Sequence, residues 1–261
     1  MIKAVFFDID GTLVSFQTHR IPDSAKKAIR RLREKGIKVF IATGRHWRVI
    51  NNLDGLEFDG YVTLNGSCCY VGKDKLVYKR TIPGEDIRHL LELEQGPESF
   101  PCIFVQENGM FINYVNALTD EVFRLLNFPE PPQRDIREAL LVDNYQLIAF
   151  FKEDQEERIM QLLSGCEATR WNPLFTDVVP AGGSKRVGME KILEYFGITR
   201  EECMALGDGG NDIPMLQYAG IGVAMGNARE EVKSQADFVT RSVDEDGVEY
   251  ALRHFGLLEC S

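Results

Sequence analysis

Apolar strands alternate with amphipathic helices at the start of the chain. Residues 3–7 form a mostly apolar run, which is typical of a strand that is covered on both faces. A helix is predicted from Pro22 to Gly36, because alanine, isoleucine and leucine recur there at helical spacing. A second apolar run, residues 37–42, follows directly. This strand–helix–strand unit predicts two parallel strands.

The pattern changes near residue 82 and returns near residue 184. Between them, alternating strands are grouped with helices, which predicts an α+β module with an antiparallel sheet. The expected elements are helices 85–94, 120–126 and 155–163 and strands 102–105, 110–114, 146–151, 166–171 and 174–179. After residue 184, helices 186–196, 212–218 and 228–235 alternate with strands 203–206, 220–224 and 238–239, before a last helix to residue 255.

The sequence therefore predicts an α/β protein with a discontinuous core domain. Residues 1–80 and 184–261 would form a Rossmann-like parallel-sheet core, and residues 81–183 an inserted α+β domain of ordinary domain size. A short helix over residues 47–53 and a hairpin over residues 68–79 are expected within the first core segment.

The amino-acid composition limits the kinds of molecule that the protein is expected to bind. The 261 residues are 44% hydrophobic and 27% charged, with a net charge of −10, so one large domain or two modest ones can form. An acidic chain is a poor ligand for nucleic-acid backbones, and no nucleic-acid partner is expected. No apolar run is long enough to span a bilayer, so we expect no membrane partner and a cytoplasmic location.

The six cysteines form neither a C-x-x-C pair nor a cluster with histidine. This spacing indicates neither a zinc site nor a disulfide framework. The cysteines are interpreted as small core residues in a reducing compartment.

Two carboxylates follow the first strand, in the sequence Asp8-Ile9-Asp10-Gly11-Thr12. Ligands of open parallel sheets bind beyond the carboxyl ends of the strands, so both acids are expected at such a crevice. About 4 Å apart at an effective dielectric near 20, their repulsion would cost about 4 kcal/mol, so a cation or a proton is required. Aspartate oxygens suit Mg²⁺. The alternative is a solvated turn at the strand end.

Two further strands end in similar turns, Thr43-Gly44-Arg45 and Gly207-Asp208-Gly209-Gly210-Asn211-Asp212. If the strand ends meet, Asp8, Asp10 and Asp208 supply the ligands of one Mg²⁺. Lys185 stands where the parallel pattern resumes, and by itself reads as an ordinary surface lysine at a helix start.

Taken together, these four signatures resemble the haloacid dehalogenase superfamily of phosphotransferases. Their order and the insertion between the second and third signatures resemble the Cof-type subfamily with a C2B cap, whose members are sugar-phosphatase-like. Four ordered motifs are more specific than any one of them. The resemblance covers the whole chain and implies that the inserted domain is a cap that acts as a lid and selects the substrate.

The resemblance also implies roles for individual residues. Asp8 would be the nucleophile that becomes an aspartyl phosphate, and Asp10 the general acid and base. Mg²⁺ would be held by the Asp8 carboxylate, the Asp10 carbonyl and Asp208. The residues implied to hold the phosphoryl oxygens are Thr43, Gly44, Lys185 and Asn211. Asp212 would orient Lys185 or a metal-bound water, and Arg45 would form a salt bridge at the seam between the domains.

The cap residues near the joint offer candidate substrate contacts, namely Arg170, Trp171 and Asp177, with cap structure as the alternative. The predicted enzyme is a monomeric Mg²⁺-dependent phosphatase of small phosphorylated metabolites, with hexose phosphates favoured by the resemblance. Two alternatives remain at this point. A phosphomutase would need a second phosphate site made by cap arginines, and a regulatory phosphate-binding protein would need no acid/base residue.

Overall fold

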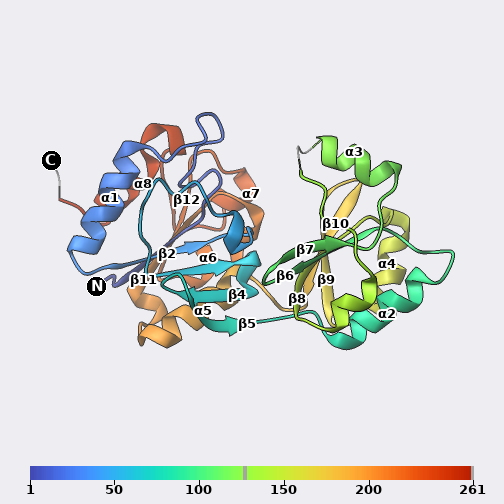
Figure 1. Ribbon diagram of the computed structural model, residues 1–261. Helices are drawn as coiled ribbons and strands as arrows, with labels where there is room; N and C mark the ends of the chain where they lie inside the picture. The colour runs from blue at the N-terminus through green and yellow to red at the C-terminus, as the bar shows by residue number, and fades with distance from the viewer. Residues whose placement is uncertain (126–127, 260–261) are drawn as a thin grey trace. The chain divides into compact units, whose positions relative to one another are not determined.

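The first strand, β1 (Ala4–Phe7), lies inside an eight-stranded sheet. The computed structural model describes residues 1–125 and 128–259, without the side chain of Trp171. All four residues of β1 are fully buried. The strand pairs in parallel with β2 (Lys38–Ala42) on one side and with β11 (Cys203–Gly207) on the other (Figure 1). The expectation of a parallel-sheet strand covered on both faces is therefore confirmed.

The strand order creates a topological switch point between β1 and β11, where the direction in which successive strands are added to the sheet reverses. The sheet runs β13-β12-β11-β1-β2-β3-β4-β5, so the chain builds outward from β1 in one direction and from β11 in the other. Strands β13 to β3 are parallel, and β4 and β5 are antiparallel. The remaining strands are β3 (Gly60–Thr63), β4 (Cys68–Val71), β5 (Lys75–Lys79), β12 (Ile221–Ala224) and β13 (Phe238–Val239). Crevices at such switch points bind ligands at the carboxyl ends of the strands.

Helices cover both faces of this sheet. Val5 and Phe7 pack in one apolar cluster with α1 (Asp23–Glu34) and α8 (Gly247–His254). Ala4 and Phe6 point to the opposite face and pack with the second helical layer. That layer contains α5 (Lys185–Phe196), α6 (Ile213–Tyr218) and α7 (Glu230–Lys233). Helical layers therefore cover β1 on both faces.

One predicted helix is mostly absent. Residues 47–53 were expected to be helical, but only a single 3₁₀ turn forms, from Trp47 to Val49. Asp54 and Gly55 follow with φ angles of 48° and 74°, and two asparagines precede them. These residue types favour turns over helix, so the segment leaves the helical conformation early.

The chain divides into two units, Met1–Lys79 with Ser184–Ser261, and Arg80–Gly183. The second unit contains a five-stranded antiparallel sheet of order β7-β6-β8-β10-β9. Its strands are β6 (Cys102–Gln106), β7 (Gly109–Ile112), β8 (Asn144–Ala149), β9 (Cys166–Asn172) and β10 (Phe175–Pro180). Its helices are α2 (Gly84–Glu94), α3 (Ala117–Leu125) and α4 (Glu153–Leu162), and α2 and α4 share an apolar cluster with the sheet. The predicted α+β architecture is confirmed.

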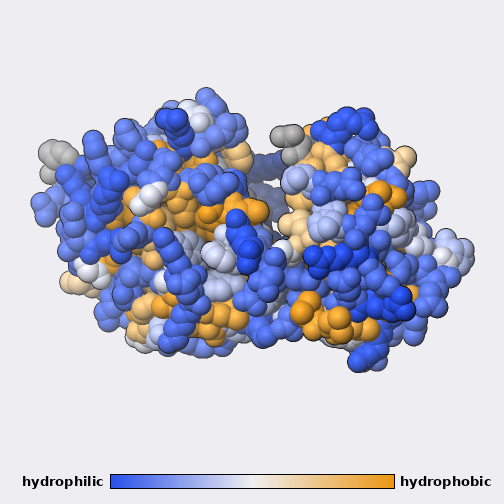
Figure 2. Space-filling view, viewed as in Figure 1, coloured by the Kyte–Doolittle hydropathy of each residue, from blue (hydrophilic) through white to orange (hydrophobic). Residues whose placement is uncertain are grey.

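The side of both units drawn in Figure 2 is largely hydrophilic. No helix among residues 1–125 and 128–259 has the length and apolar character needed to cross a membrane. The five cysteines in this part of the chain are buried, and it contains no disulfide bond. Burial raises the pKa of the Cys69 and Cys102 thiols above the ordinary value.

Candidate active site at the carboxyl ends of the central strands

Asp8 and Asp208 lie at the ends of neighbouring strands. Asp8 follows β1, and its backbone N–H donates to the carbonyl of Leu206 in β11 over 3.0 Å. Asp208 follows β11, and its Oδ1 accepts a 2.8 Å hydrogen bond from the Thr12 hydroxyl. The parallel pairing of two central strands thus brings together carboxylates that are 200 residues apart in the sequence.

Gly11 allows Asp208 to approach the first turn. Its φ angle is +86°, and a methyl group at this position would lie 2.2 Å from Oδ2 of Asp208. Both observations require glycine, one through backbone conformation and the other through space. Any side chain here would push the Asp208 carboxylate out of the site.

Lys185 is the buried cation of the site. It is the first residue of α5, whose N-cap is Ser184, and it is 1% exposed. Its Nζ donates 2.6 Å hydrogen bonds to Oδ1 of Asp8 and to Oδ1 of Asp212. A buried ammonium requires such partners, because an unpaired charge in the interior costs several kcal/mol. Lys185 is therefore not a surface lysine.

Asp212 connects the lysine with the turn after β11. Its Oδ2 accepts hydrogen bonds from the backbone N–H groups of Asp208 and Gly209, over 2.9 and 2.8 Å. A methyl group at Gly207 would lie 2.5 Å from Cβ of Asp212, and one at Gly209 would lie 2.5 Å from Oδ1 of Asn211. These two glycines therefore make room for the side chains of the site itself.

The electrostatics of the carboxylates favour a cation. Burial raises the pKa of Asp8 to about 8, although Lys185 acts in the opposite direction. Burial also raises the pKa of Asp208 to about 6. Burial lowers the pKa of Lys185, but the charges of Asp212 and Asp8 outweigh it, and the net shift is upward. Lys185 therefore stays charged. Its single positive charge does not fully offset the cost of burying the ionised carboxylates of Asp8 and Asp208.

The donor set fits a hard divalent cation. Asp8, Asp208 and Asp212 each offer a carboxylate oxygen, and these oxygens lie within 4.8 Å of one another. Oxygen-only ligands of this kind suit Mg²⁺. The carboxylate of Asp10 lies outside this group, because Nε and Nη2 of Arg45 bind its two oxygens over 2.7 and 2.6 Å. Asp10 is still predicted to bind the metal, through its backbone carbonyl oxygen.

Thr43, Gly44 and Asn211 lie on the turns after β2 and β11. Thr43 is 1% exposed, and its Oγ1 accepts a 3.1 Å hydrogen bond from the N–H of Arg45. Nδ2 of Asn211 donates to Oδ1 of Asn65 over 2.9 Å, and Asn65 also lies against Gly44. Asn65, which belongs to none of the four sequence motifs, therefore contacts two of the predicted phosphoryl-binding residues, Gly44 and Asn211.

Two asparagines at the site were missed. Asn65 belongs to an Asn-Gly pair, which by itself indicates only a turn. Asn227 follows β12, and its Nδ2 donates to the Gly11 carbonyl over 2.9 Å and to Oδ2 of Asp208 over 3.4 Å. Both residues follow parallel strands, and the strand-end rule that selected Asp8 could have found them.

The predicted cap contacts lie in the second unit. The Arg170 guanidinium binds Glu156 over 2.6 Å and the Phe151 carbonyl over 3.2 Å, so it stabilises the cap itself. Asp177 is half-buried in β10. Trp171 belongs to β9, and its side chain lies outside the described part of the structure.

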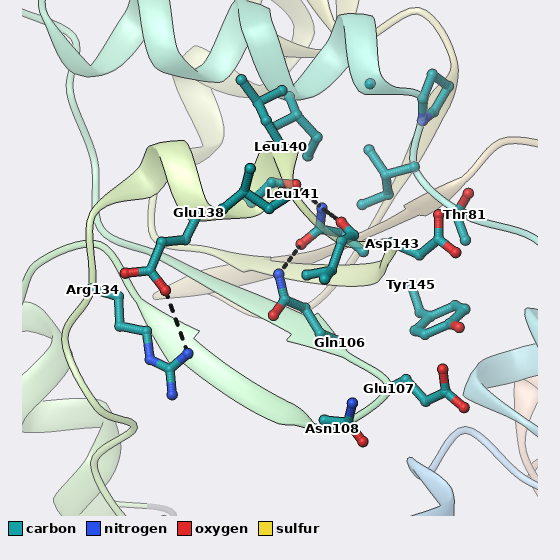
Figure 3. A pocket seen from close by; sticks show the side chains of 17 residues that line it. Thr81, Gln106, Glu107, Asn108, Arg134, Glu138, Leu140, Leu141, Asp143 and Tyr145 are labelled. Carbon is teal, nitrogen blue, oxygen red and sulfur yellow. Dashed lines mark hydrogen bonds and ion pairs between the residues drawn. The ribbon is translucent and has the colours of Figure 1, made fainter.

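The second unit also contains a cavity of about 760 Å³ that the sequence did not predict (Figure 3). The end of β6 contributes Gln106, the following turn contributes Glu107, and the segment before β8 contributes Leu141 and Asp143. Asn144 organises one wall, because its amide accepts from Gln106 and donates to the Ala139 and Val142 carbonyls. Neither Arg170 nor Asp177 lines this cavity.

Comparisons with known proteins extend over nearly the whole chain. The sequence model of the haloacid dehalogenase-like hydrolase family matches residues 5–252. YkrA of Bacillus subtilis is 35% identical over 264 residues, which are 98% of this chain and 99% of YkrA. The 5-amino-6-(5-phospho-D-ribitylamino)uracil phosphatase YcsE of the same organism is 32% identical over 258 residues, or 98% of this chain and 96% of YcsE.

Solved structures of phosphatases share the fold. BT1666 from Bacteroides thetaiotaomicron, a phosphatase of the haloalkanoate (HAD) superfamily, superposes with a TM-score of 0.90 at 43% identity, over 99% of this chain and 96% of BT1666. The subclass IIB sugar phosphatase BT4131 superposes with a TM-score of 0.83 at 44% identity, over 98% of this chain and all of BT4131.

Proposed function

Because the chain belongs to the haloacid dehalogenase-like hydrolase family, we propose that it is a Mg²⁺-dependent phosphatase of small sugar phosphates. The observation that carries this proposal is the convergence of Asp8, Asp208 and Lys185 at the ends of two central strands. A nucleophilic carboxylate, a cation site and a buried ammonium in one place are the parts that phosphoryl transfer requires.

Asp8 is assigned as the nucleophile. Lys185 binds its Oδ1, and no hydrogen bond among the described residues engages its Oδ2, so Oδ2 is available to attack phosphorus. The new O–P bond forms as the bond to the sugar oxygen breaks, which leaves an aspartyl phosphate on Asp8. Lys185, the Gly44 amide and the Asn211 amide would donate hydrogen bonds to the phosphoryl oxygens.

Asp10 is assigned as the proton carrier. It gives its proton to the leaving sugar oxygen, and then takes one from the water that attacks the aspartyl phosphate and releases inorganic phosphate. The bidentate contact with Arg45 fixes the orientation of the Asp10 carboxylate but engages both of its oxygens, so one of these contacts must break before that oxygen carries the proton.

The metal would be held by Asp8, the Asp10 carbonyl and Asp208. Mg²⁺, when bound, neutralises part of the charge that otherwise keeps an anionic nucleophile from an anionic phosphate. Asp212 is assigned a supporting position, because both of its oxygens accept hydrogen bonds from Lys185 and the backbone.

Similarity to BT4131 at 44% identity supports sugar phosphates as the substrate class, and YcsE at 32% identity supports a ribityl phosphate less strongly. The mutase alternative needs free cationic groups in the cap. Instead, four of the six cap arginines pair with cap carboxylates, in the pairs Arg134 with Glu138, Arg137 with Asp135, Arg158 with Glu98 and Arg170 with Glu156. We therefore assign the inserted unit the role of a lid that selects the leaving group.

Removal of divalent cations should abolish phosphate release. We expect the purified protein to hydrolyse hexose and pentose phosphates with Mg²⁺ and to lose the activity in EDTA, because the carboxylates of Asp8 and Asp208 would then repel the substrate phosphate. The measurement is a phosphate-release screen over sugar phosphates, nucleotides and the ribityl phosphate, with and without Mg²⁺. Interconversion of hexose phosphates without free phosphate would contradict the proposal.

Asn227 should affect metal affinity. Asn227→Ala removes the amide beside Oδ2 of Asp208, and loss of such an outer contact weakens metal binding about tenfold. Calorimetric titration with Mg²⁺ measures the change. Thr240→Val is the matched control, since it removes a 2.6 Å hydrogen bond to the Gly247 carbonyl without touching Asp208. Equal Mg²⁺ affinity in both variants would show that Asn227 has no role at the metal.

A further inference from the structure

The turn after β3 has an unusual backbone. Leu64, Asn65 and Gly66 have φ angles of 49°, 52° and 96°, so three successive residues occupy the left-handed region. Non-glycine residues adopt this conformation rarely, and asparagine does so more easily than leucine. Such a backbone persists only where its surroundings fix it, and it occurs often at functional sites.

Two other parts of the site fix this turn. The N–H groups of Leu64 and Asn65 donate to the carbonyls of Arg45 and Thr43, both over 3.1 Å. On the other side, a methyl group at Gly66 would lie 2.0 Å from the carbonyl oxygen of Ser184, the N-cap of α5. The turn is thus held between the segment after β2 and the start of the helix that carries Lys185.

The Asn65 amide lies close to Gly44. A methyl group at Gly44 would be 3.2 Å from both Oδ1 and Nδ2 of Asn65. Gly44 has no positive φ angle, so its backbone conformation does not require glycine. The absence of a side chain at this position therefore leaves room for the Asn65 amide.

The same amide fixes the orientation of Asn211. Nδ2 of Asn211 donates to Oδ1 of Asn65 over 2.9 Å, while Oδ1 of Asn211 lies where a methyl group on Gly209 would be 2.5 Å away. Asn65 therefore holds the amino end of the Asn211 amide, and the second N–H of Nδ2 remains to donate to an anionic oxygen.

We infer that Asn65 is a positioning residue for phosphoryl transfer, which holds the Asn211 amide and the Gly44 N–H in the geometry that receives the phosphoryl oxygens. This inference rests on the proposed function. Asn65 acts through these two neighbours. A displacement of about 1 Å in such groups can reduce the rate about a hundredfold.

A double-mutant cycle of Asn65→Gly and Asn211→Ala tests the inference. Glycine accepts the left-handed backbone, so Asn65→Gly removes the amide and should not lower the urea unfolding midpoint. We expect a loss in kcat/KM for para-nitrophenyl phosphate of about ten- to a hundredfold and weaker inhibition by inorganic phosphate. Because Asn65 acts through both Asn211 and Gly44, the double variant should lose more activity than Asn211→Ala alone but less than the product of the two single losses.

Asp246→Gly is the matched control, because Asp246 also has a left-handed backbone, with φ of 58°, and pairs with Ser24 away from the site. Activity of Asn65→Gly within twofold of wild type would overturn the inference, as would losses that multiply in the double variant. A fall in unfolding midpoint larger than that of Asp246→Gly would assign the loss to structure and also overturn it. Failure of the proposed function is a separate result, because the wild-type protein itself would then release no phosphate.

Discussion

Asp8→Asn should yield a folded protein whose phosphatase activity is lower by about 10⁴-fold or more, since an amide cannot form the phosphoenzyme. Asparagine has the same shape as aspartate and still accepts the Lys185 hydrogen bond. Because burial already raises the pKa of Asp8 to about 8, a neutral side chain fits this position. We therefore expect the free energy of unfolding to stay within about 1 kcal/mol of wild type. Phosphate release and urea unfolding measure the two effects.

The matched control is Asp59→Asn in the same unit. Asp59 accepts a 2.9 Å hydrogen bond from the N–H of Val39 and pairs with Lys38, at the start of β2. This variant should retain wild-type turnover. Intact mass spectrometry of wild-type enzyme quenched during turnover should detect one added phosphoryl group, absent from Asp8→Asn. Substantial turnover by Asp8→Asn would exclude the covalent mechanism.

The core fold was predictable because its strands are buried on both faces. Ala4 to Phe7 pack alternately into two apolar layers, and such continuous apolar runs identify central parallel strands in sequence. The segment from Trp47 to Gly55 was predicted less well. Its helical pattern is weak, and local turn residues outweigh it.

The candidate site was predictable only where a chemically reactive side chain directly follows a buried strand. Asp8 and Asp208 stand out because acids directly after buried strands are unusual. Lys185 gave no such signal by itself, since its burial depends on Asp8 and Asp212, which lie 177 and 27 residues away. Asn65 and Asn227 follow the parallel strands β3 and β12, so the strand-end rule places them at this edge of the sheet. Composition and spacing do not reveal their individual contacts with Asn211 and Asp208.

The cap contacts were the least predictable part. Arg170 was selected for its charge and position, but the structure shows its guanidinium bound to Glu156 and the Phe151 carbonyl. A charged residue in a strand of an α+β unit can stabilise the unit through an ion pair or can bind a substrate. Only the groups that it contacts in the structure distinguish these two roles. The cap cavity arises from loops whose packing depends on Asn144, a residue without an evident pattern.

Lys185→Met should destabilise the protein more than any other change at this site. It removes the cation that binds both Asp8 and Asp212, and breaking a buried ion pair by deleting one partner costs about 3–5 kcal/mol. In EDTA, we expect the free energy of unfolding to fall by about that amount. Added Mg²⁺ should restore part of the loss, because it supplies positive charge to the same carboxylates. Activity should fall by about 10²–10³-fold even with Mg²⁺, since one phosphoryl donor is missing.

Lys191→Met separates this effect from the general loss of a lysine on α5. The Lys191 side chain is 35% exposed and pairs with Glu194 one turn further along the helix, over 2.8 Å. Exposed pairs of this kind contribute less than about 1 kcal/mol, so this variant should remain close to wild type in both stability and turnover. Urea unfolding of both variants, with EDTA and with Mg²⁺, gives the comparison. If Lys185→Met were as stable as Lys191→Met in EDTA, the carboxylates would not depend on Lys185 for their counter-charge, and its assigned contact with the phosphoryl group would lose its structural basis.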